Sequence, residues 1–302
     1  LIGSHLGENM HNLQVQEFAK AVERRIPIIV VDPRFSVAAS KAKYWLPIKP
    51  GTDLALLLAW MNVLVSEGRY DQAFVAKYGH GFDKFAAEIK AYTPEWAATE
   101  TGIDANLIRV TAREFASHRP ATIVHPGRRV NWNGDDTQRS RAIALLSALL
   151  GNWGRKGGLF LATGMKIAPY PLPPYPKSDK PKADGSDGAR YPFADEGITT
   201  SIRDATLTGK PYPIKGWFVY SSNVIYALPN TSETLKAIDN LDLLVVVDPF
   251  PSATAAMAAM PGKAEDLNPN RAVYLLPATT QFETSGSVTA SNRSIQWREK
   301  VI

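Results

Sequence analysis

Two short, unbroken apolar runs that each end in Asp-Pro constrain the fold of this chain more than any other feature. Residues 26–34 read IPIIVVDPR, and residues 241–250 read LDLLVVVDPF. A strand with one face in water alternates apolar and polar residues, whereas a strand of a parallel sheet is covered on both faces and is apolar throughout. Proline has no N–H to donate to a neighbouring strand and so ends each run. The pattern predicts two interior strands of parallel sheets.

The polar residues that follow these strands are candidates for a ligand-binding edge. In open α/β sheets, ligands bind beyond the carboxyl ends of the strands. At that edge, Asp32 could accept hydrogen bonds from ribose hydroxyls or from the N–H edge of a purine, and Arg34 could clamp a phosphate. A plain turn with a surface ion pair explains one such motif equally well. Its recurrence at Asp248 favours two edges that hold related groups of one ligand.

Strand-like and helix-like segments alternate around the first run, which predicts a doubly wound, mostly parallel sheet. A long helix follows KPGTD, with Thr52 or Asp53 as its cap, and Gly68 ends it. A further buried strand in residues 120–129 would bring Gly127, Arg128 and Arg129 to the same edge.

We therefore expect two such α/β domains in an internal fragment of a larger multidomain subunit. The expected boundaries are residues 1–160 for the first domain, 161–213 for an irregular proline-rich excursion, and 214–302 for part of the second.

Composition and missing motifs exclude several classes of protein. The chain has no cysteine, so residues 1–302 cannot form disulfides, zinc–thiolate sites or ligands of an iron–sulfur cluster. Its 34 Lys and Arg are scattered, which gives no clear sign of nucleic-acid binding, and no apolar run is long enough to span a membrane. The turn GSHLGEN does not match the G-x-G-x-x-G of dinucleotide-binding dehydrogenases, which disfavours an NAD enzyme. The residues alone indicate a binding scaffold whose strand ends suit anions, with His5 and His125 near that edge.

Several longer motifs resemble one family. LIGSHLGEN, VVDPRFS, LPIKPGTD, YTPEWAATETGI, LLGNWGRKGG and LDLLVVVDPFPS occur in the order and spacing of the molybdopterin oxidoreductases of the dimethyl sulfoxide reductase family. The resemblance covers nearly the whole chain. The stretches HPGRRVNWNGDDTQRSR and IRDATLTGKPYPIKGW are most similar to the catalytic subunits of polysulfide and thiosulfate reductases. The tail, AVYLLPATTQFETSGSVTASNRSIQ, instead resembles the formate dehydrogenase branch.

This resemblance implies a cofactor and its contacts. In the family, two pterin guanine dinucleotides hold one molybdenum or tungsten ion, and each lies along the strand ends of one α/β domain. The implied cofactor-binding residues are Gly3, Ser4, His5, Glu8, Asp32, Arg34, Gly51 and Asp53, followed by Ser221, Ser222, Asn223 and Asp248. Gly51 would let the backbone approach closely, and Asp53 would accept both Watson–Crick N–H groups of guanine, unless it serves only as a helix cap. This chain departs from the family at His5-Leu6, where Asn-Pro is usual, and at Ser221 or Ser222, where glycine is frequent.

The family's metal ligand and cysteine-rich cluster motif lie upstream of the matching region, so the resemblance assigns no catalytic residue or metal ligand within this chain. It implies part of the catalytic subunit of a molybdenum or tungsten oxidoreductase in anaerobic respiration, with a sulfur compound such as polysulfide or thiosulfate as its small-molecule substrate. An iron–sulfur electron-transfer subunit, a membrane anchor subunit and a periplasmic, membrane-associated location are further implications. A formate dehydrogenase alpha subunit and a cofactor-free structural paralogue in a respiratory complex remain as alternatives.

Overall fold

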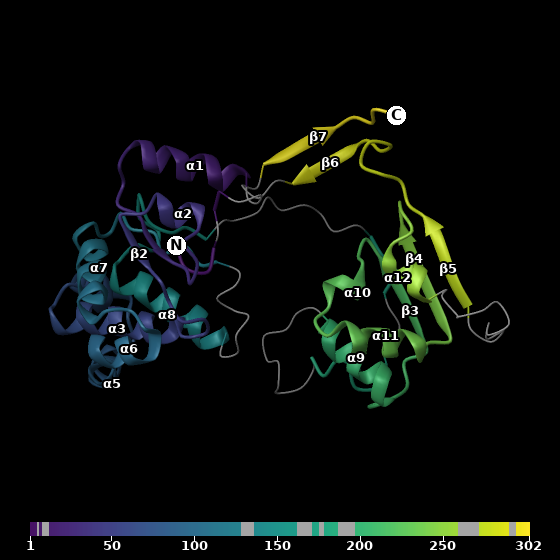
Figure 1. Ribbon diagram of the computed structural model, residues 1–302, viewed down its shortest axis with the longest axis horizontal. Helices are drawn as coiled ribbons and strands as arrows, with labels where there is room; N and C mark the ends of the chain where they lie inside the picture. Colours follow the sequence, from purple (N-terminus) through teal and green to yellow (C-terminus); the bar gives the residue numbers. More distant parts are fainter. Residues whose placement is uncertain are drawn as a thin grey trace. The chain divides into compact units, whose positions relative to one another are not determined.

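The structure is a computed structural model that describes residues 1–4, 6–7, 12–127, 136–161, 171–174, 178–186, 197–258, 272–289 and 294–302 (Figure 1). The chain divides into two compact units, Leu1–Ala162 and Thr163–Ile302. Both units contain parallel strands with helices packed on them. This is the α/β class, with parallel sheets, that the sequence predicts.

The sheet of the first unit is parallel, and the order in which its strands are added reverses at one point. Strand β1 (Ile29–Val31) pairs with β2 (Tyr44–Leu46), and Ile2 bridges in parallel to both Val31 and Pro126. The spatial order is therefore β2, β1, the segment at Ile2, and the segment at Pro126. Numbered along the chain, this order is 3-2-1-4, which is the order of doubly wound sheets. The first three segments are added toward one edge of the sheet, and the segment at Pro126 is added on the other side of Ile2. The switch point of the sheet therefore lies between Ile2 and Pro126.

Strand β1 is covered on both faces, as its unbroken apolar run predicts. Val31 belongs to the main core of the unit, whereas Val30 packs with Ala38 and Ala39 on the other side of the sheet. The expected strand in residues 120–129 is much shorter and consists of a bridge at Pro126. Proline at positions 120 and 126 explains this, because neither residue can donate a backbone hydrogen bond.

Helix α3 is the centre of the first unit. It spans Asp53–Ser66 and packs against α6 (Pro94–Thr101), α7 (Ala105–Ser117) and α8 (Asp136–Leu149). Its Leu56, Leu57, Met61 and Leu64 are fully buried, and each such side chain contributes roughly 1.5–3 kcal/mol. The remaining helical elements of this unit are α1 (Asn12–Glu23), α2 (Val37–Ser40), α4 (Gln72–Tyr78), α5 (Phe82–Glu88) and η1 (Ile89–Ala91). The packing of α3 fixes the position of Asp53, its first residue, and of the preceding loop, which contains Gly51.

The second unit holds a parallel sheet in the order β3 (Gly216–Tyr220), β4 (Leu243–Asp248), β5 (Ala272–Pro277). Helices α10 (Val224–Ala227), α11 (Thr231–Asp239) and α12 (Ala253–Ala258) connect the strands and share one apolar core with them. Strands β6 (Gly286–Thr289) and β7 (Ile295–Arg298) form an antiparallel pair. Within the described residues, no helix is both long enough and apolar enough to cross a membrane.

Helix α9 (Thr199–Thr208) packs on α11 and lies inside the stretch that we expected to be irregular. Its sequence, TTSIRDATLT, is rich in β-branched residues, which are poor helix formers. The helix therefore depends on its packing more than on local propensity.

Candidate functional site

The strand ends of the first unit meet most closely at two glycines. The Gly127 N–H donates to the Ile2 carbonyl at 2.6 Å, and a Cβ on Gly127 would lie 2.0 Å from the carbonyl carbon and oxygen of Gly3. Only glycine fits this approach. Gly3 has a φ of 61°, in the left-handed region, so the chain turns sharply as it leaves the sheet. Gly3 and Ser4 therefore follow the switch point directly, where doubly wound sheets bind their ligands.

Asp32 ends β1 in a turn that it stabilises itself. Its Oδ1 accepts from the Arg34 N–H at 2.9 Å, and its own N–H donates to the Leu46 carbonyl at 3.2 Å. The indole N–H of Trp45 donates to the Asp32 carbonyl at 2.8 Å. Asp32 is half-buried and Arg34 is exposed. The turn thus holds Asp32 at the carboxyl end of β1 and leaves one of its two carboxylate oxygens outside the turn hydrogen bond.

The loop after β2 delivers a buried carboxylate. Gly51 has a φ of 87°, and Asp53 opens α3 with only 8% of its surface exposed. The residue at the cap position of α3 is Thr52, whose hydroxyl donates to the Lys49 carbonyl at 2.7 Å. Burial raises the pKa of Asp53, while a hydrogen bond from its own backbone N–H and the positive charge of Arg139 act in the opposite direction. Asp53 is therefore a first-turn residue and not the helix cap.

Arg139 is a contributor to this edge that the sequence reading missed. It lies in the first turn of α8, is 3% exposed, and donates from Nη2 to the Gly51 carbonyl at 3.2 Å. The first turn of a helix favours acids and disfavours cations. Arg139 in the first turn of α8 was therefore the one sequence signal of a role other than helix stability.

The strand ends of the second unit use similar local geometry. The Ser221 N–H donates to the Val247 carbonyl at 3.3 Å, and Ser221 has a φ of 55°. Asp248 Oδ1 accepts from the Phe250 N–H at 3.0 Å, which repeats the turn at Asp32. The fully buried Thr254, also missed from sequence, donates to Asn223 Oδ1 at 2.8 Å and so links the ends of β3 and β4.

The predicted site residues thus fall into two groups, each on the strand ends of its own unit. In the first unit, Gly3, Ser4, Asp32, Arg34, Gly51 and Asp53 follow the ends of neighbouring parallel segments. In the second, Ser221, Ser222 and Asn223 follow β3, and Asp248 ends β4. His5, Glu8, Arg128 and Arg129 lie outside the described residues. No group of three or more His, Cys, Asp or Glu side chains suited to a metal occurs in the part of the chain that the structure describes.

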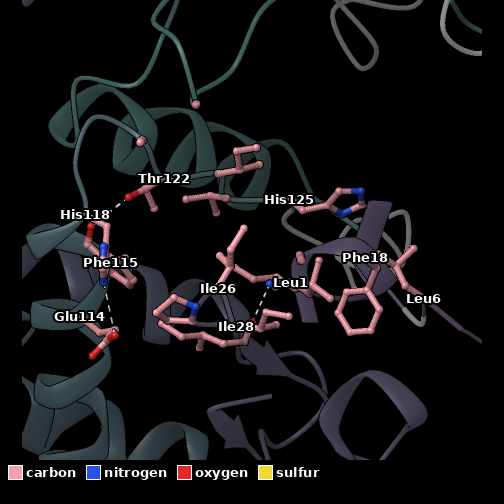
Figure 2. Close-up of a pocket in the computed structure, with 18 of the residues that line it drawn as sticks. Leu1, Leu6, Phe18, Ile26, Ile28, Glu114, Phe115, His118, Thr122 and His125 are labelled. Atoms are coloured by element: carbon pink, nitrogen blue, oxygen red, sulfur yellow. Dashed lines mark hydrogen bonds and ion pairs between the residues drawn. The ribbon is translucent and has the colours of Figure 1, made fainter. Parts of the chain in front are cut away.

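The first unit contains a cavity of about 700 Å³, whose wall includes Leu1 and Ile28 at the starts of strand segments together with Leu6 and His125. Figure 2 shows Leu1, Phe18, Ile26 and Phe115 in its largely apolar wall. Its polar groups include His118, which lies 3.6 Å from a Glu114 carboxylate oxygen. Among the described residues that are predicted to bind the cofactor, none lines this cavity. His125, which we expected near the ligand edge, is in the wall of this cavity, and Ile2 and Leu6 join that wall to the segment of Gly3 and Ser4.

The strand order defines the first unit as a doubly wound α/β domain with a switch point between Ile2 and Pro126. All 302 residues match the family model for molybdopterin oxidoreductase. The chain is 35% identical to the thiosulfate reductase molybdopterin-containing subunit PhsA of Salmonella typhimurium, over 95% of this chain and 38% of that protein. It is 29% identical to the F420-dependent formate dehydrogenase subunit alpha of Methanocaldococcus jannaschii, over 100% of this chain and 44% of that protein.

Among solved structures, acetylene hydratase from Pelobacter acetylenicus matches the whole chain with a TM-score of 0.81 and 26% identity, over 44% of its own length. The chain belongs to the molybdopterin oxidoreductase family, within the dimethyl sulfoxide reductase group, as the motifs indicated. It spans about two fifths of the length of these relatives.

Proposed function

We propose that this chain forms the part of a molybdenum or tungsten oxidoreductase catalytic subunit that binds the molybdopterin guanine dinucleotides. The observation that carries the proposal is the edge of the first sheet. There, Gly3 and Gly127 meet at the switch point, and Asp32 and Asp53 follow the two neighbouring strands. Membership of the molybdopterin oxidoreductase family supports a molybdopterin ligand at this edge.

The residues at this edge suit the chemistry of a guanine dinucleotide. The left-handed turn at Gly3 lets backbone approach a phosphate closely, and Arg34 provides a cation for it. An ionised Asp53 offers two acceptor oxygens to the N1–H and exocyclic amino group of guanine, a pair of donors that adenine does not present. Ser221, Ser222, Asn223 and Asp248 would serve the second dinucleotide. When bound, the metal–pterin group supplies the redox chemistry, and the chain supplies binding and orientation.

We further propose a sulfur compound, thiosulfate or polysulfide, as the substrate. The 35% identity to PhsA and the motifs shared with that branch support this choice. An iron–sulfur electron-transfer subunit, a membrane anchor subunit and a periplasmic location belong to the same proposal. A formate dehydrogenase alpha subunit is the second candidate, because that relative aligns with the whole chain and the tail carries motifs of that branch.

Cofactor analysis of the full-length subunit tests the proposal. We expect about one molybdenum or tungsten ion and two acid-released guanines per subunit. Reductase assays with thiosulfate and polysulfide, and a formate dehydrogenase assay, then separate the two substrate candidates. A purified subunit with neither metal nor guanine would refute the cofactor proposal and favour a structural paralogue.

A further inference from the structure

Arg139 is a buried cation that reaches across the first unit to a loop 88 residues away in the chain. A guanidinium is seldom buried unless hydrogen bonds and opposite charge compensate the loss of water. Arg139 is 3% exposed and donates from Nη2 to the Gly51 carbonyl at 3.2 Å. Its place therefore points to a role in the loop that contains Gly51.

The loop is held from three directions. Lys49 donates its N–H to the Thr101 carbonyl at 2.9 Å, at the end of α6, and the Thr52 hydroxyl closes the turn by donating to the Lys49 carbonyl. Arg139 provides the third restraint, from α8. Because Gly51 precedes Asp53 by two residues and has a left-handed φ of 87°, fixing its carbonyl also fixes the direction in which the chain enters α3.

The same guanidinium acts on the Asp53 carboxyl. Burial raises the Asp53 pKa, and the charge of Arg139 lowers it. Two cations of the neighbouring helix α7 pair elsewhere, Arg109 with Glu95 and Arg113 with Glu67, and the side chain of Lys49, in the loop itself, is exposed. Within the described residues, Arg139 is thus the cation whose charge favours the ionised form of Asp53.

We propose that Arg139 is a positioning residue for guanine recognition, which fixes the Gly51 carbonyl and holds Asp53 as an ionised acceptor. The inference rests on the proposed function of Asp53. A neutral carboxylic acid carries its own O–H donor, so it cannot accept from both N–H groups of guanine at once. Guanine binding therefore requires the ionised carboxylate, and Arg139 extends the pH range over which that form persists.

The test uses the full-length subunit produced in a host that cannot make the pterin cofactor. Equilibrium dialysis measures the affinities for guanosine and adenosine diphosphate between about pH 5 and pH 8. At the upper end of this pH range, Arg139→Gln should weaken guanosine diphosphate binding roughly tenfold or more, since a charge-assisted hydrogen bond is lost. It should also move the pH at which binding fades upward, because the charge that favours the ionised Asp53 is removed.

Two further variants separate charge from hydrogen bonding. Arg139→Lys keeps the charge without the planar fork, so it should restore the wild-type pH profile but bind guanosine diphosphate more weakly. Arg141→Gln is the matched control: Arg141 is exposed on the same helix, donates to Gln138 at 3.3 Å, and should behave as wild type.

The outcomes distinguish the two levels of the proposal. Equal affinity of the wild type for guanosine and adenosine diphosphate would overturn the guanine site itself. A wild-type preference for guanosine diphosphate that Arg139→Gln leaves unchanged in strength and pH profile would overturn the positioning role alone. If Arg139→Gln does not fold, Arg139→Lys decides. A guanosine diphosphate affinity equal to wild type would refute the role of the guanidinium hydrogen bond, and a shifted pH profile would refute the role of the Arg139 charge.

Discussion

Replacing Asp53 by asparagine should exchange the base that the first unit binds. An ionised Asp53 would accept from both N–H groups of guanine, whereas an asparagine side chain has one acceptor and presents an N–H to a guanine N–H. Asp53 is 8% exposed, so water cannot replace the lost hydrogen bond easily. Loss of one charge-assisted hydrogen bond plus one donor–donor contact corresponds to roughly 3–4 kcal/mol, or about 100- to 1000-fold in affinity.

Xanthine provides a rescue for this variant. It keeps the N1–H of guanine but has a carbonyl in place of the exocyclic amino group. The introduced amide would therefore accept from N1–H and donate to that carbonyl, so Asp53→Asn should gain affinity for xanthosine diphosphate as it loses affinity for guanosine diphosphate. Equilibrium dialysis of the cofactor-free, full-length subunit measures both. Asp104→Asn is the control, because Asp104 caps α7 by accepting from the Leu107 N–H and asparagine caps equally well.

The stability of Asp53→Asn gives an independent readout. Burial raises the Asp53 pKa, so the folded state holds the proton more tightly than the unfolded state does. The contribution of Asp53 to stability is therefore present at low pH and is lost as the pH rises through the raised pKa. The variant should exceed wild type in urea resistance at neutral pH and match it in acid. Unchanged nucleotide preference together with unchanged stability would refute both the base contact and the buried charge.

Two other substitutions test the backbone geometry of the strand ends by urea unfolding. Ser221→Gly should stabilise the second unit by about 0.5–1 kcal/mol, because a left-handed serine is strained by about 1–2 kcal/mol and glycine returns part of this gain as unfolded-state entropy; a loss of stability would contradict the strain. Gly127→Ala should destabilise the first unit by about 3 kcal/mol, because its Cβ would overlap the Gly3 backbone, whereas Gly286→Ala, with open space at its Cβ, should stay within about 0.5 kcal/mol of wild type. Equal effects of the two alanines would show that Gly3 and Gly127 do not meet.

The parts of this fold that sequence predicts are those with a local cause. Strands β1 and β4 lie in apolar runs that lead into Asp-Pro, and α7 follows Asp104, whose side chain caps the helix by accepting from the Leu107 N–H. Strand β2 could not be predicted in this way, because its three residues are too few to show a pattern of apolar and polar positions. The switch point at Ile2 and Pro126 also has no local signal, since it depends on two segments far apart in the chain.

Site residues divide along the same line. Asp32 and Asp248 are visible in sequence because each follows a buried strand directly. Arg139 and Thr254 act through partners 88 and 31 residues away, so a linear pattern contains only half of each interaction. Helix α3 shows the same limit for Asp53: the sequence places an acid near the helix start, but only the packing of α8 brings Arg139 to the preceding glycine.

The two units are built alike at their strand ends, and this likeness argues for a shared role more strongly than the repeated Asp-Pro does. In each unit the first parallel segment is followed by a left-handed residue, Gly3 with φ 61° and Ser221 with φ 55°. In each, the next segment ends in an aspartate whose Oδ1 accepts from the N–H two residues on, at 2.9 Å for Asp32 and 3.0 Å for Asp248. The Asp-Pro turn alone follows from local chemistry, because aspartate readily closes such a turn. A left-handed residue on the neighbouring segment does not follow from that turn. Serine tolerates this conformation poorly, so its presence at position 221 indicates that the second edge keeps its geometry against a local cost, as a ligand-binding edge would.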